Sequence, residues 1–449
     1  MSSKPSRSLI HLAQFLVHGP THHSLAMWRH PLTRAASQAH GWDWRRPELY
    51  QHIAQTCERG CFDMVFFADL NYIADTYTGS MAPALQHATQ APEHDPLPLL
   101  SFMAAATKHI GLASTLSVSH HHPFYAARLW ATLDHLTNGR AGWNVVTSLN
   151  SNQSANYGET RANSDLRYDR AHEFMEVCRA LWNSWDKDAL VDNPDVPMMS
   201  NPDKVRRIEF EGQFFKSRGP LNVARSPQNG PAILQAGVSP KGRDFAAKYA
   251  DGIFAIQPNA DEAKKYFTDI KARIAELGGT PEHCRMLFGM QPFVGESEAH
   301  AQDLRDEHNA LVADDGGLAI LSAHTDFDLA TIDLDKPMAE IDEPRLDRMQ
   351  SRAVRPDGTS MSAREVARRH GQSVSLPQFV GTAESVADQM EAFIDHVGGD
   401  GFMVSMAYCP GALEAFVDHV VPVLQKRGRM RTRYTGSTLR DTLKESTAD

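Results

Sequence analysis

Eight short β-rich runs recur along the chain with helical stretches between them, and this alternation constrains the fold more than any other feature. The candidate strands are Leu9–Val17, Phe62–Ala68, Ile110–Val118, Ala141–Ser148, Ala232–Ala236, Gly252–Ile256, Met286–Val294 and Phe402–Ala407. Strands that alternate with helices form parallel sheets, so eight such units predict an α/β protein with a (β/α)8 TIM barrel. An open doubly wound sheet is the alternative, but no G-x-G-x-x-G follows any of the eight runs.

The helical stretches carry start and stop signals. PLPLLSFMAAATKH follows Asp95, a suitable N-cap, and TAESVADQMEAFIDHVGG opens with Thr382 and closes at Gly398 and Gly399. In RYDRAHEFMEVCRALWNSW the apolar side chains recur at helical spacing, at Phe174, Val177, Cys178, Leu181 and Trp182. We therefore predict helices over these three segments.

Two stretches depart from the simple repeat. Residues 186–226 are predicted to form a loop with a short β pair (RIEFEGQFFKS), and residues 313–378 are long, polar and charged, with one brief helix-like patch at SAREVARRH. We expect a single barrel domain, 1–449, with both insertions over the carboxyl-terminal mouth, where they shape a substrate pocket. The last residues, 437–449, are polar and are expected to form a surface arm.

The composition narrows the classes of protein to consider. The net charge of −10 gives no basic field that would attract nucleic acid or an anionic membrane, and no apolar run has the length of a membrane helix. His11, Gln14 and His18 interrupt the apolar stretch near the start, so we expect no signal peptide. The five cysteines are odd in number and mostly isolated, which argues against a disulfide scaffold and fits a reducing cytoplasm.

The segment Gly230–Ile256 reads as strand, glycine-containing turn, helix and strand. Ser239 can cap the helix and Pro240 suits its first position, so free N–H groups and the helix dipole favour an anion such as phosphate. The phosphate loop of nucleoside-triphosphate enzymes is excluded because Arg243 stands where Lys and then Ser or Thr are required. An ordinary capped helix without a ligand remains the alternative.

Polar side chains at two strand ends are further candidates. Asp69 closes the apolar run FDMVFFADL and is expected at the carboxyl-terminal mouth, where barrel active sites form, although such an Asp can also cap a helix. Asn144, Thr147 and Ser148 interrupt an apolar strand and must find hydrogen-bond partners, either in a ligand or in a neighbouring strand.

The 22 histidines do not predict a metal site. His120, His121 and His122 are adjacent, and adjacent side chains point in different directions rather than toward one ion. H-E-x-x-H is absent, and so is the G-x-S-x-G turn of a hydrolase nucleophile. We expect no metal, although a metal-dependent barrel hydrolase that uses the His-rich loops remains an alternative.

Six segments, spread over most of the chain from about 11 to 443, share the pattern of one family: WRHP, ERGCFDMVFFADL, ARLWATLDHLTNGRAGWNVVTS, RYDRAHEFMEV, LQAGVSPKGRDFAAKYAD and GFMVSMAYCPGALEAFVDHVVPVLQKRGRMRTRYTGSTLRDTL. In them the chain resembles the luciferase-like flavin monooxygenases, in the branch of the nitrilotriacetate, dibenzothiophene-sulfone and long-chain alkane enzymes. The resemblance implies a barrel that receives reduced FMN from a separate NAD(P)H:flavin reductase. It also implies that O₂ serves to insert one oxygen atom into a small organic substrate, by oxidation or cleavage of a C–N, C–S or C–H bond.

The resemblance also implies roles for individual residues. Asp69 and Thr115 match residues near the flavin ring, Tyr168 and Ser239 match residues near its phosphate, and Asn144 lies in a matching strand. Ser164 replaces a usual His and Val238 a usual small or hydroxyl residue. The predicted cofactor-binding residues are Asp69, Thr115, Asn144, Ser164, Tyr168, Val238 and Ser239. His22 and His324 match pocket histidines and are the predicted catalytic residues, with a proton or peroxide hydrogen bond as their hypothetical task.

The resemblance also implies partners. We expect a homodimer or homotetramer. The sequence gives neither the identity of the substrate nor the role of His120, His121 and His122. Within the same fold, a deazaflavin- or flavin-dependent hydride-transfer enzyme is the nearest alternative, and a non-catalytic flavin-binding protein is another.

Overall fold

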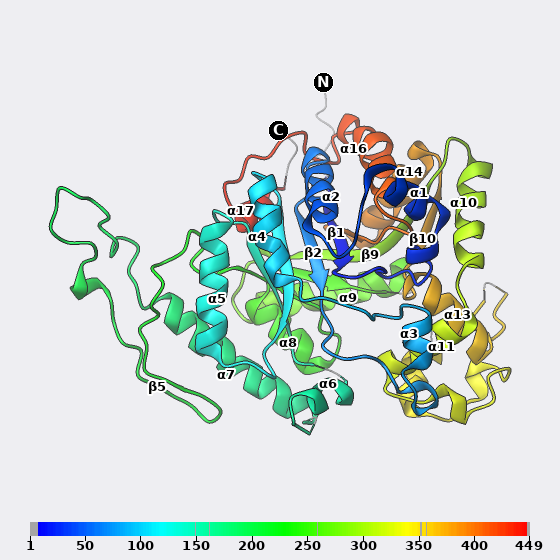
Figure 1. The fold of residues 1–449 in the computed structure, drawn as a ribbon, viewed down its shortest axis with the longest axis horizontal. Coiled ribbons are helices and arrows are strands. Elements are labelled where there is room, and N and C mark those ends of the chain that lie inside the picture. The colour runs from blue at the N-terminus through cyan, green and yellow to red at the C-terminus, as the bar shows by residue number, and fades with distance from the viewer. Residues whose placement is uncertain are drawn as a thin grey trace.

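Eight parallel strands close into a barrel in the computed structural model, which describes residues 8–148, 150–160, 162–257, 259–350, 353–355 and 357–446 (Figure 1). Around the barrel the strands are β1 (His11–Val17), β2 (Met64–Ala68), β3 (Gly111–Ser117), β4 (Ala141–Val146), β7 (Ala232–Gln235), β8 (Gly252–Ala255), β9 (Arg285–Val294) and β11 (Gly401–Val404). Because β11 pairs with both β1 and β9, and β8 also pairs with β9, these eight strands form a closed barrel. The predicted (β/α)8 barrel and all eight predicted strands are confirmed.

Helices cover the outside of the barrel. The helices that follow barrel strands are α2 (Pro47–Arg59), α4 (Leu97–Ala106), α5 (Pro123–Leu136), α7 (Ser164–Trp182), α8 (Pro240–Tyr249), α9 (Ala260–Glu276), α14 (Ala383–Val397), α15 (Gly411–Ala415) and α16 (Val421–Lys426). Shorter or additional ones are α1 (Pro31–His40), α3 (Ala82–Gln86), α6 (Ser151–Asn156) and α10 (Glu298–Ala310). The three predicted helices are confirmed, and α14 has the predicted Thr382 N-cap and Gly398 C-cap. The N-cap of α4 is Pro96 and not the predicted Asp95, which precedes it and accepts a hydrogen bond from the Leu97 N–H at 2.9 Å.

Side-chain alternation divides the core into two parts. One cluster fills the inside of the barrel and includes Ala13, Phe15, Phe66 and Met403. A larger cluster lies between the strands and the outer helices. Alternate strand residues therefore face inward, as parallel barrel strands require.

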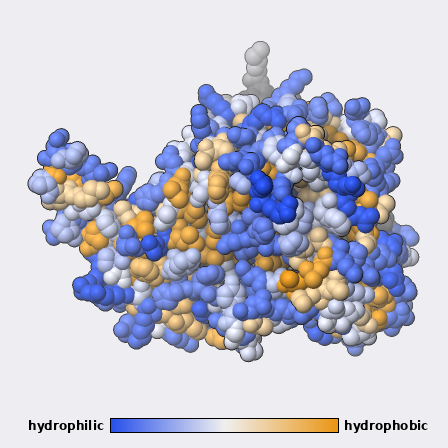
Figure 2. Space-filling model, in the orientation of Figure 1, coloured by the Kyte–Doolittle hydropathy of each residue, from blue (hydrophilic) through white to orange (hydrophobic). Residues whose placement is uncertain are grey.

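The insertion at 186–226 forms the predicted β pair, with β5 (Phe210–Glu211) antiparallel to β6 (Lys216–Ser217). In Figure 1 its first half stands out from the body as a long arm. Figure 2 shows a mainly hydrophilic face on which apolar side chains gather over α4 and over α3, where Phe102, Met81 and Leu85 are about half exposed. Such apolar areas are typical of contact surfaces.

The prediction for 313–378 is wrong in one respect, because the segment contains more than one helix. α11 (Asp314–Thr325) packs against α13 (Ala363–Ser373), which is the predicted patch, and α12 (Asp347–Gln350) lies between them in the chain. These elements share a small apolar cluster of their own. A further strand, β10 (Gln378–Gly381), extends from the end of the segment and pairs with the last four residues of β9. In the sequence, the many charged residues of the segment obscure the pattern of the apolar residues that form this cluster.

The expected surface arm at 437–449 is also wrong over its described part. The segment forms α17 (Leu439–Lys444), and Leu439 and Leu443 are fully buried inside the amino-terminal end of the barrel. Gly142 on β4 leaves the necessary room, since a Cβ there would lie 3.0 Å from Leu439 Cδ2. Two apolar side chains on a single turn thus dock a segment that is otherwise polar.

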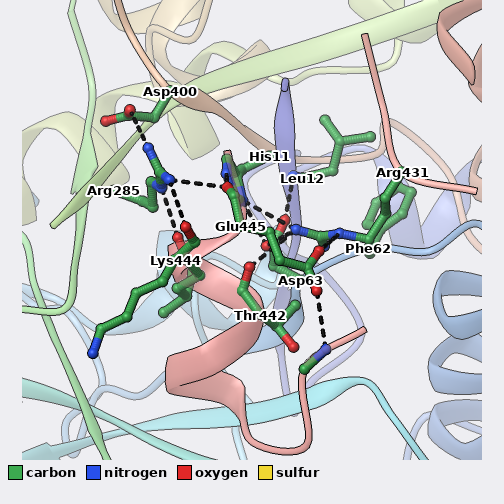
Figure 3. Close-up of polar contacts among 12 residues, drawn as sticks. His11, Leu12, Phe62, Asp63, Arg285, Asp400, Arg431, Thr442, Lys444 and Glu445 are labelled. Carbon is green, nitrogen blue, oxygen red and sulfur yellow. Dashed lines mark hydrogen bonds and ion pairs between the residues drawn. The ribbon is translucent and has the colours of Figure 1, made fainter. Parts of the chain in front are cut away.

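A buried network of ion pairs holds this segment in place (Figure 3). Asp63 accepts hydrogen bonds from Arg431 (2.9 Å) and from the Leu12 amide (2.8 Å), and it lies 2.7 Å from His11 Nδ1. Arg431 also donates to Glu445 at 2.6 Å. Beside them Arg285 binds Asp400 and donates to the backbone carbonyls of Leu443, Lys444 and Glu445. The network therefore joins β1 at the start of the chain to α17 near its end.

In the part of the chain that the structure describes, no helix is both long and apolar enough to cross a bilayer.

Candidate active site

The predicted site residues lie near the carboxyl ends of neighbouring strands. Asp69 directly follows β2, Thr115 lies in β3, Asn144 in β4, and Ser239 in the turn after β7. The strand register places Thr115 opposite Asn144, and Asn144 opposite Leu234 of β7. The structure thus gathers these side chains at one mouth of the barrel, where barrel enzymes place their catalytic groups.

A hydrogen-bonded relay links β2, β3 and β4 at this mouth. The Thr115 hydroxyl donates to the Phe67 carbonyl at 2.9 Å, and the Asn144 side-chain N–H donates to the Thr115 oxygen at 2.9 Å. Both side chains are about 95% buried. The Asn144 Oδ1 atom is buried too, and no donor among the described residues reaches it.

A second polar cradle surrounds Gly242 at the start of α8. Ser239 caps the helix, since its Oγ accepts a hydrogen bond from the Gly242 N–H at 3.1 Å. A Cβ on Gly242 would lie 2.6 Å from the Tyr168 hydroxyl and 3.0 Å from Ser239 Oγ. The two residues predicted at a phosphate therefore converge on one glycine, at a helix terminus whose free N–H groups attract anions.

Two further predicted residues lie beside this cradle. Ser164 begins α7 and stands one helical turn before Tyr168, so that both residues lie on the same side of the helix. Val238 is half-buried, and its backbone carbonyl accepts a hydrogen bond from Arg243 at 3.0 Å. Val238 contributes backbone rather than a polar side chain to the turn.

Carboxyl groups cluster where β2 ends. Burial, reinforced by Asp95, raises the pKa of Asp69 to about 7, although a hydrogen bond with Asn71 opposes the shift. Glu93 accepts a hydrogen bond from the Leu70 amide at 3.1 Å, and burial together with Asp69 raises the pKa of Glu93 well above its usual value. Sequence reasoning missed Glu93, which lies in an irregular loop without periodicity.

The two predicted catalytic histidines approach the same neighbour. Burial lowers the pKa of His22 to about 3, so this side chain is neutral at pH 7. Burial lowers the pKa of His23 as well, and the nearby His324 and His22 add to the effect. His324 Nδ1 lies 2.9 Å from His370 Nε2, and its Nε2 lies 3.2 Å from Gln90 Oε1. The hypothetical proton task of His22 is thus not supported near pH 7, whereas a hydrogen bond from its neutral ring remains open.

The segment 313–378 contacts loops that follow two barrel strands. Asn150, after β4, donates to the Ala323 carbonyl of α11 at 3.2 Å, and the Thr78 amide, after β2, donates to Asp328 at 3.0 Å.

A cleft of about 550 Å³ reaches His22 from outside and is lined by aromatic side chains that include Trp28, Trp42, Trp44 and Tyr50.

The remaining candidates have local partners. His120 stacks on Tyr157 with 4.2 Å between ring centroids, His121 Nδ1 lies 2.9 Å from the Ser117 carbonyl, and His122 caps α5. Ser148 lies 2.5 Å from Ser117 Oγ on the adjacent strand. Within the described ranges, no three His, Cys, Asp or Glu side chains are grouped to hold a metal ion.

Both the sequence and the fold are similar to those of known proteins. Residues 23–401 match the family described as luciferase-like monooxygenase. The dibenzothiophene-sulfone monooxygenase of Rhodococcus erythropolis (strain XP) is 40% identical over 442 residues, which cover 97% of this chain and 96% of that protein. The nitrilotriacetate monooxygenase component A of Aminobacter aminovorans is 36% identical over 431 residues, 91% of this chain and 94% of that one.

Among solved structures, a riboflavin lyase determined with modified FMN and riboflavin superposes with a TM-score of 0.87, at 27% identity, and the match covers 97% of this chain and 96% of that chain. The protein described here belongs to the luciferase-like monooxygenase family. Its relatives are monooxygenases, which assigns it to the oxidoreductases.

Proposed function

We propose that the protein is the oxygenase of a two-component flavin monooxygenase that uses reduced FMN and O₂ to insert one oxygen atom into a small organic substrate. The observation that carries the proposal is the convergence of Tyr168 and Ser239 on Gly242 at the start of α8. In a barrel of this family, that cradle suits the phosphate that distinguishes FMN from riboflavin.

The residues present fit a flavin. The cradle supplies hydroxyl groups and helix N–H groups for the phosphate, with Ser164 and the Val238 backbone beside it. Asp69, Thr115 and Asn144 supply polar atoms for the ring at the strand ends, and the buried, unpartnered Asn144 Oδ1 is an acceptor that a ring N–H can satisfy. The proposal thus assigns the seven predicted cofactor-binding residues to two parts of FMN, four to the phosphate and three to the ring.

When bound, the reduced flavin supplies the electrons that activate O₂, and the protein orients the reactants and excludes water. His22, neutral and buried, can hydrogen-bond the reacting oxygen without carrying charge. His324, bridged to His370 and Gln90, is the better candidate for moving a proton at its ring nitrogens. The partial protonation of Asp69 near neutral pH limits repulsion of an anionic cofactor.

The substrate is expected to approach through the aromatic cleft beside His22, and the segment 313–378 is expected to shape the pocket above the strand ends. We further propose a separate NAD(P)H:flavin reductase, since a relative is named as component A of its enzyme. The apolar areas over α3 and α4 support the expected homo-oligomer.

Anaerobic titration tests the cofactor first. The purified protein is titrated with chemically reduced FMN and, separately, with reduced riboflavin, and binding is followed by the change in protein fluorescence. Preference for FMN supports the cradle, and absence of binding to either flavin contradicts the proposed function. Aerobic assays with candidate substrates then follow incorporation of one ¹⁸O atom from ¹⁸O₂.

The roles of His22 and His324 are tested by measuring how far flavin oxidation is coupled to product formation. His22→Phe and His324→Phe are compared with the unaltered protein for product formed and H₂O₂ released per flavin consumed. We expect more H₂O₂ per product in both variants, and unchanged coupling in both removes the histidines from the mechanism.

A further inference from the structure

The relay at the strand ends fixes the direction of the Asn144 amide. The Phe67 carbonyl can only accept, so the Thr115 hydroxyl proton is directed to it. The Thr115 oxygen is then left as an acceptor and takes a hydrogen bond from Asn144 Nδ2. Asn144 therefore presents Oδ1, and not its N–H₂ group, away from Thr115.

The Oδ1 atom presented in this way lacks a partner. It is buried, it belongs to a side chain that is 95% buried, and no donor among the described residues reaches it. A buried acceptor left unsatisfied is costly, so a ligand that brings a donor to this position recovers the lost stabilisation. A ligand atom that is itself an acceptor is disfavoured there while the Thr115 proton is on the Phe67 carbonyl, because turning the amide over would then set Oδ1 against the Thr115 oxygen, two acceptors.

The oxidised and reduced forms of a flavin differ in the hydrogen bonds that a ring nitrogen can make. Reduction adds a hydrogen to a ring nitrogen that is a bare acceptor in the oxidised form. A forced acceptor therefore discriminates between the two redox states wherever it meets that nitrogen. Thr115 of β3 pairs in register with Asn144 of β4, and Asn144 pairs with Leu234 of β7. Because β7 leads to the Ser239 cradle, the acceptor lies on the strand next to the one that ends at that cradle.

We propose that Asn144 Oδ1, oriented by Thr115, accepts a hydrogen bond from the ring N–H that reduced flavin carries and oxidised flavin lacks, and thereby makes the site prefer reduced FMN. The inference rests on the proposed function and deepens it. A preference of this kind lets the protein take up the reduced flavin and release the oxidised one after turnover. Asn144 is thus a specificity-determining residue and Thr115 a positioning residue.

The test measures dissociation constants for reduced and oxidised FMN under anaerobic conditions. Asn144→Leu removes the acceptor at similar volume, and we expect it to reduce the preference for reduced FMN by roughly tenfold. By linkage, a tenfold change in that preference lowers the two-electron midpoint potential of the bound flavin by about 30 mV. Spectroelectrochemical titration therefore gives a second readout that does not depend on activity.

A matched pair of variants tests the positioning role. Thr115→Val deletes the hydroxyl and lets the Asn144 amide rotate, so part of the redox preference is expected to disappear. Thr115→Ser keeps the hydroxyl and is expected to retain the preference. Circular dichroism and urea unfolding confirm that each variant is folded before the comparison.

The possible outcomes separate the two proposals. If the unaltered protein binds neither form of FMN, the proposed function fails. If it binds FMN but Asn144→Leu weakens both redox states equally, the acceptor meets a nitrogen that carries hydrogen in both forms, and the inference about redox preference is overturned. Loss of preference in Thr115→Ser as well as in Thr115→Val contradicts the positioning role.

Discussion

At the scale of single residues, the two ends of the barrel use carboxyl groups in opposite ways. Asp63, at the amino-terminal end, is buried. Burial alone would raise its pKa, but Arg431 and His11 outweigh that effect and hold the pKa well below its usual value. Asp69, at the other end, has a raised pKa because burial and Asp95 are not balanced by a cation. The first carboxyl is thus held ionised by its partners, whereas the second keeps its proton up to about pH 7.

We expect Asp63→Asn to destabilise the protein by about 3–5 kcal/mol, because it leaves Arg431 buried without its full counter-charge. The free energy of unfolding at pH 7 from urea denaturation measures the effect. Asp43→Asn, which removes an ion pair with the exposed Arg45, is the control and should cost no more than about 1 kcal/mol. Equal costs for the two variants would argue against a stabilising role of the buried pair.

The pH dependence of stability should report on Asp69. An unfolded Asp loses its proton near pH 4, whereas the pKa of Asp69 in the folded protein is about 7. Between these values only the folded state keeps the proton, so this group lowers the stability progressively as pH rises from 4 to 7, after which its effect is constant. Asp69→Asn should therefore gain stability relative to the unaltered protein between pH 5.5 and pH 8.5.

Urea midpoints at the two pH values measure this gain. Asp43→Asn serves as control, because the pKa of Asp43 is about 2 and its contribution is constant over this range. A constant offset between Asp69→Asn and the unaltered protein at both pH values would contradict the raised pKa.

At the scale of elements, the cap of α8 is expected to serve both the helix and the ligand. Ser239→Ala removes the hydrogen bond to the Gly242 N–H, which should destabilise the protein by about 1 kcal/mol. It should also reduce the preference for FMN over riboflavin, since riboflavin has no phosphate to lose contact with. Thr382→Ala removes the equivalent cap of α14 and is the matched control. It should lower stability while leaving that ligand preference unchanged.

Elements were predictable from the sequence where a local pattern agreed with their final surroundings. The barrel strands are short apolar runs, and α7, α8 and α14 carry clear caps or periodicity. β10 has only four residues and exists because the end of β9 lies beside it, so no local pattern marks it. α11 was missed because its buried stretch begins with two glycines after two acidic residues, which resembles a loop.

The candidate site follows the same distinction. Asp69 and Ser239 lie at strand and helix ends that the sequence reveals, and the family resemblance supplied Thr115 and Tyr168. Neither source gave Glu93, because its place beside Leu70 depends on the path of an irregular loop. The neutral state of His22 depends on how many atoms surround it, which only the folded structure provides.

At the scale of the whole molecule, α17 closes the barrel at the end opposite the site. Leu439→Ala should destabilise the protein by about 2–5 kcal/mol, since Leu439 is fully buried among the inward-facing strand residues. Leu136→Ala, at a side chain that is 61% exposed, is the control and should change the unfolding free energy by less than about 0.5 kcal/mol. Urea unfolding measures both, and a small effect at Leu439 would show that α17 adds little to the barrel.

The network that joins β1 to α17 has a consequence for biosynthesis. Domains generally fold as units while they are being synthesised, but here His11 and Asp63 must wait for Arg431 and Glu445, which are translated more than 360 positions after Asp63. Until then Asp63 lacks its Arg431 partner, and the end of the barrel lacks Leu439. We therefore expect the nascent chain to depend on chaperones until residues 431–445 have been translated.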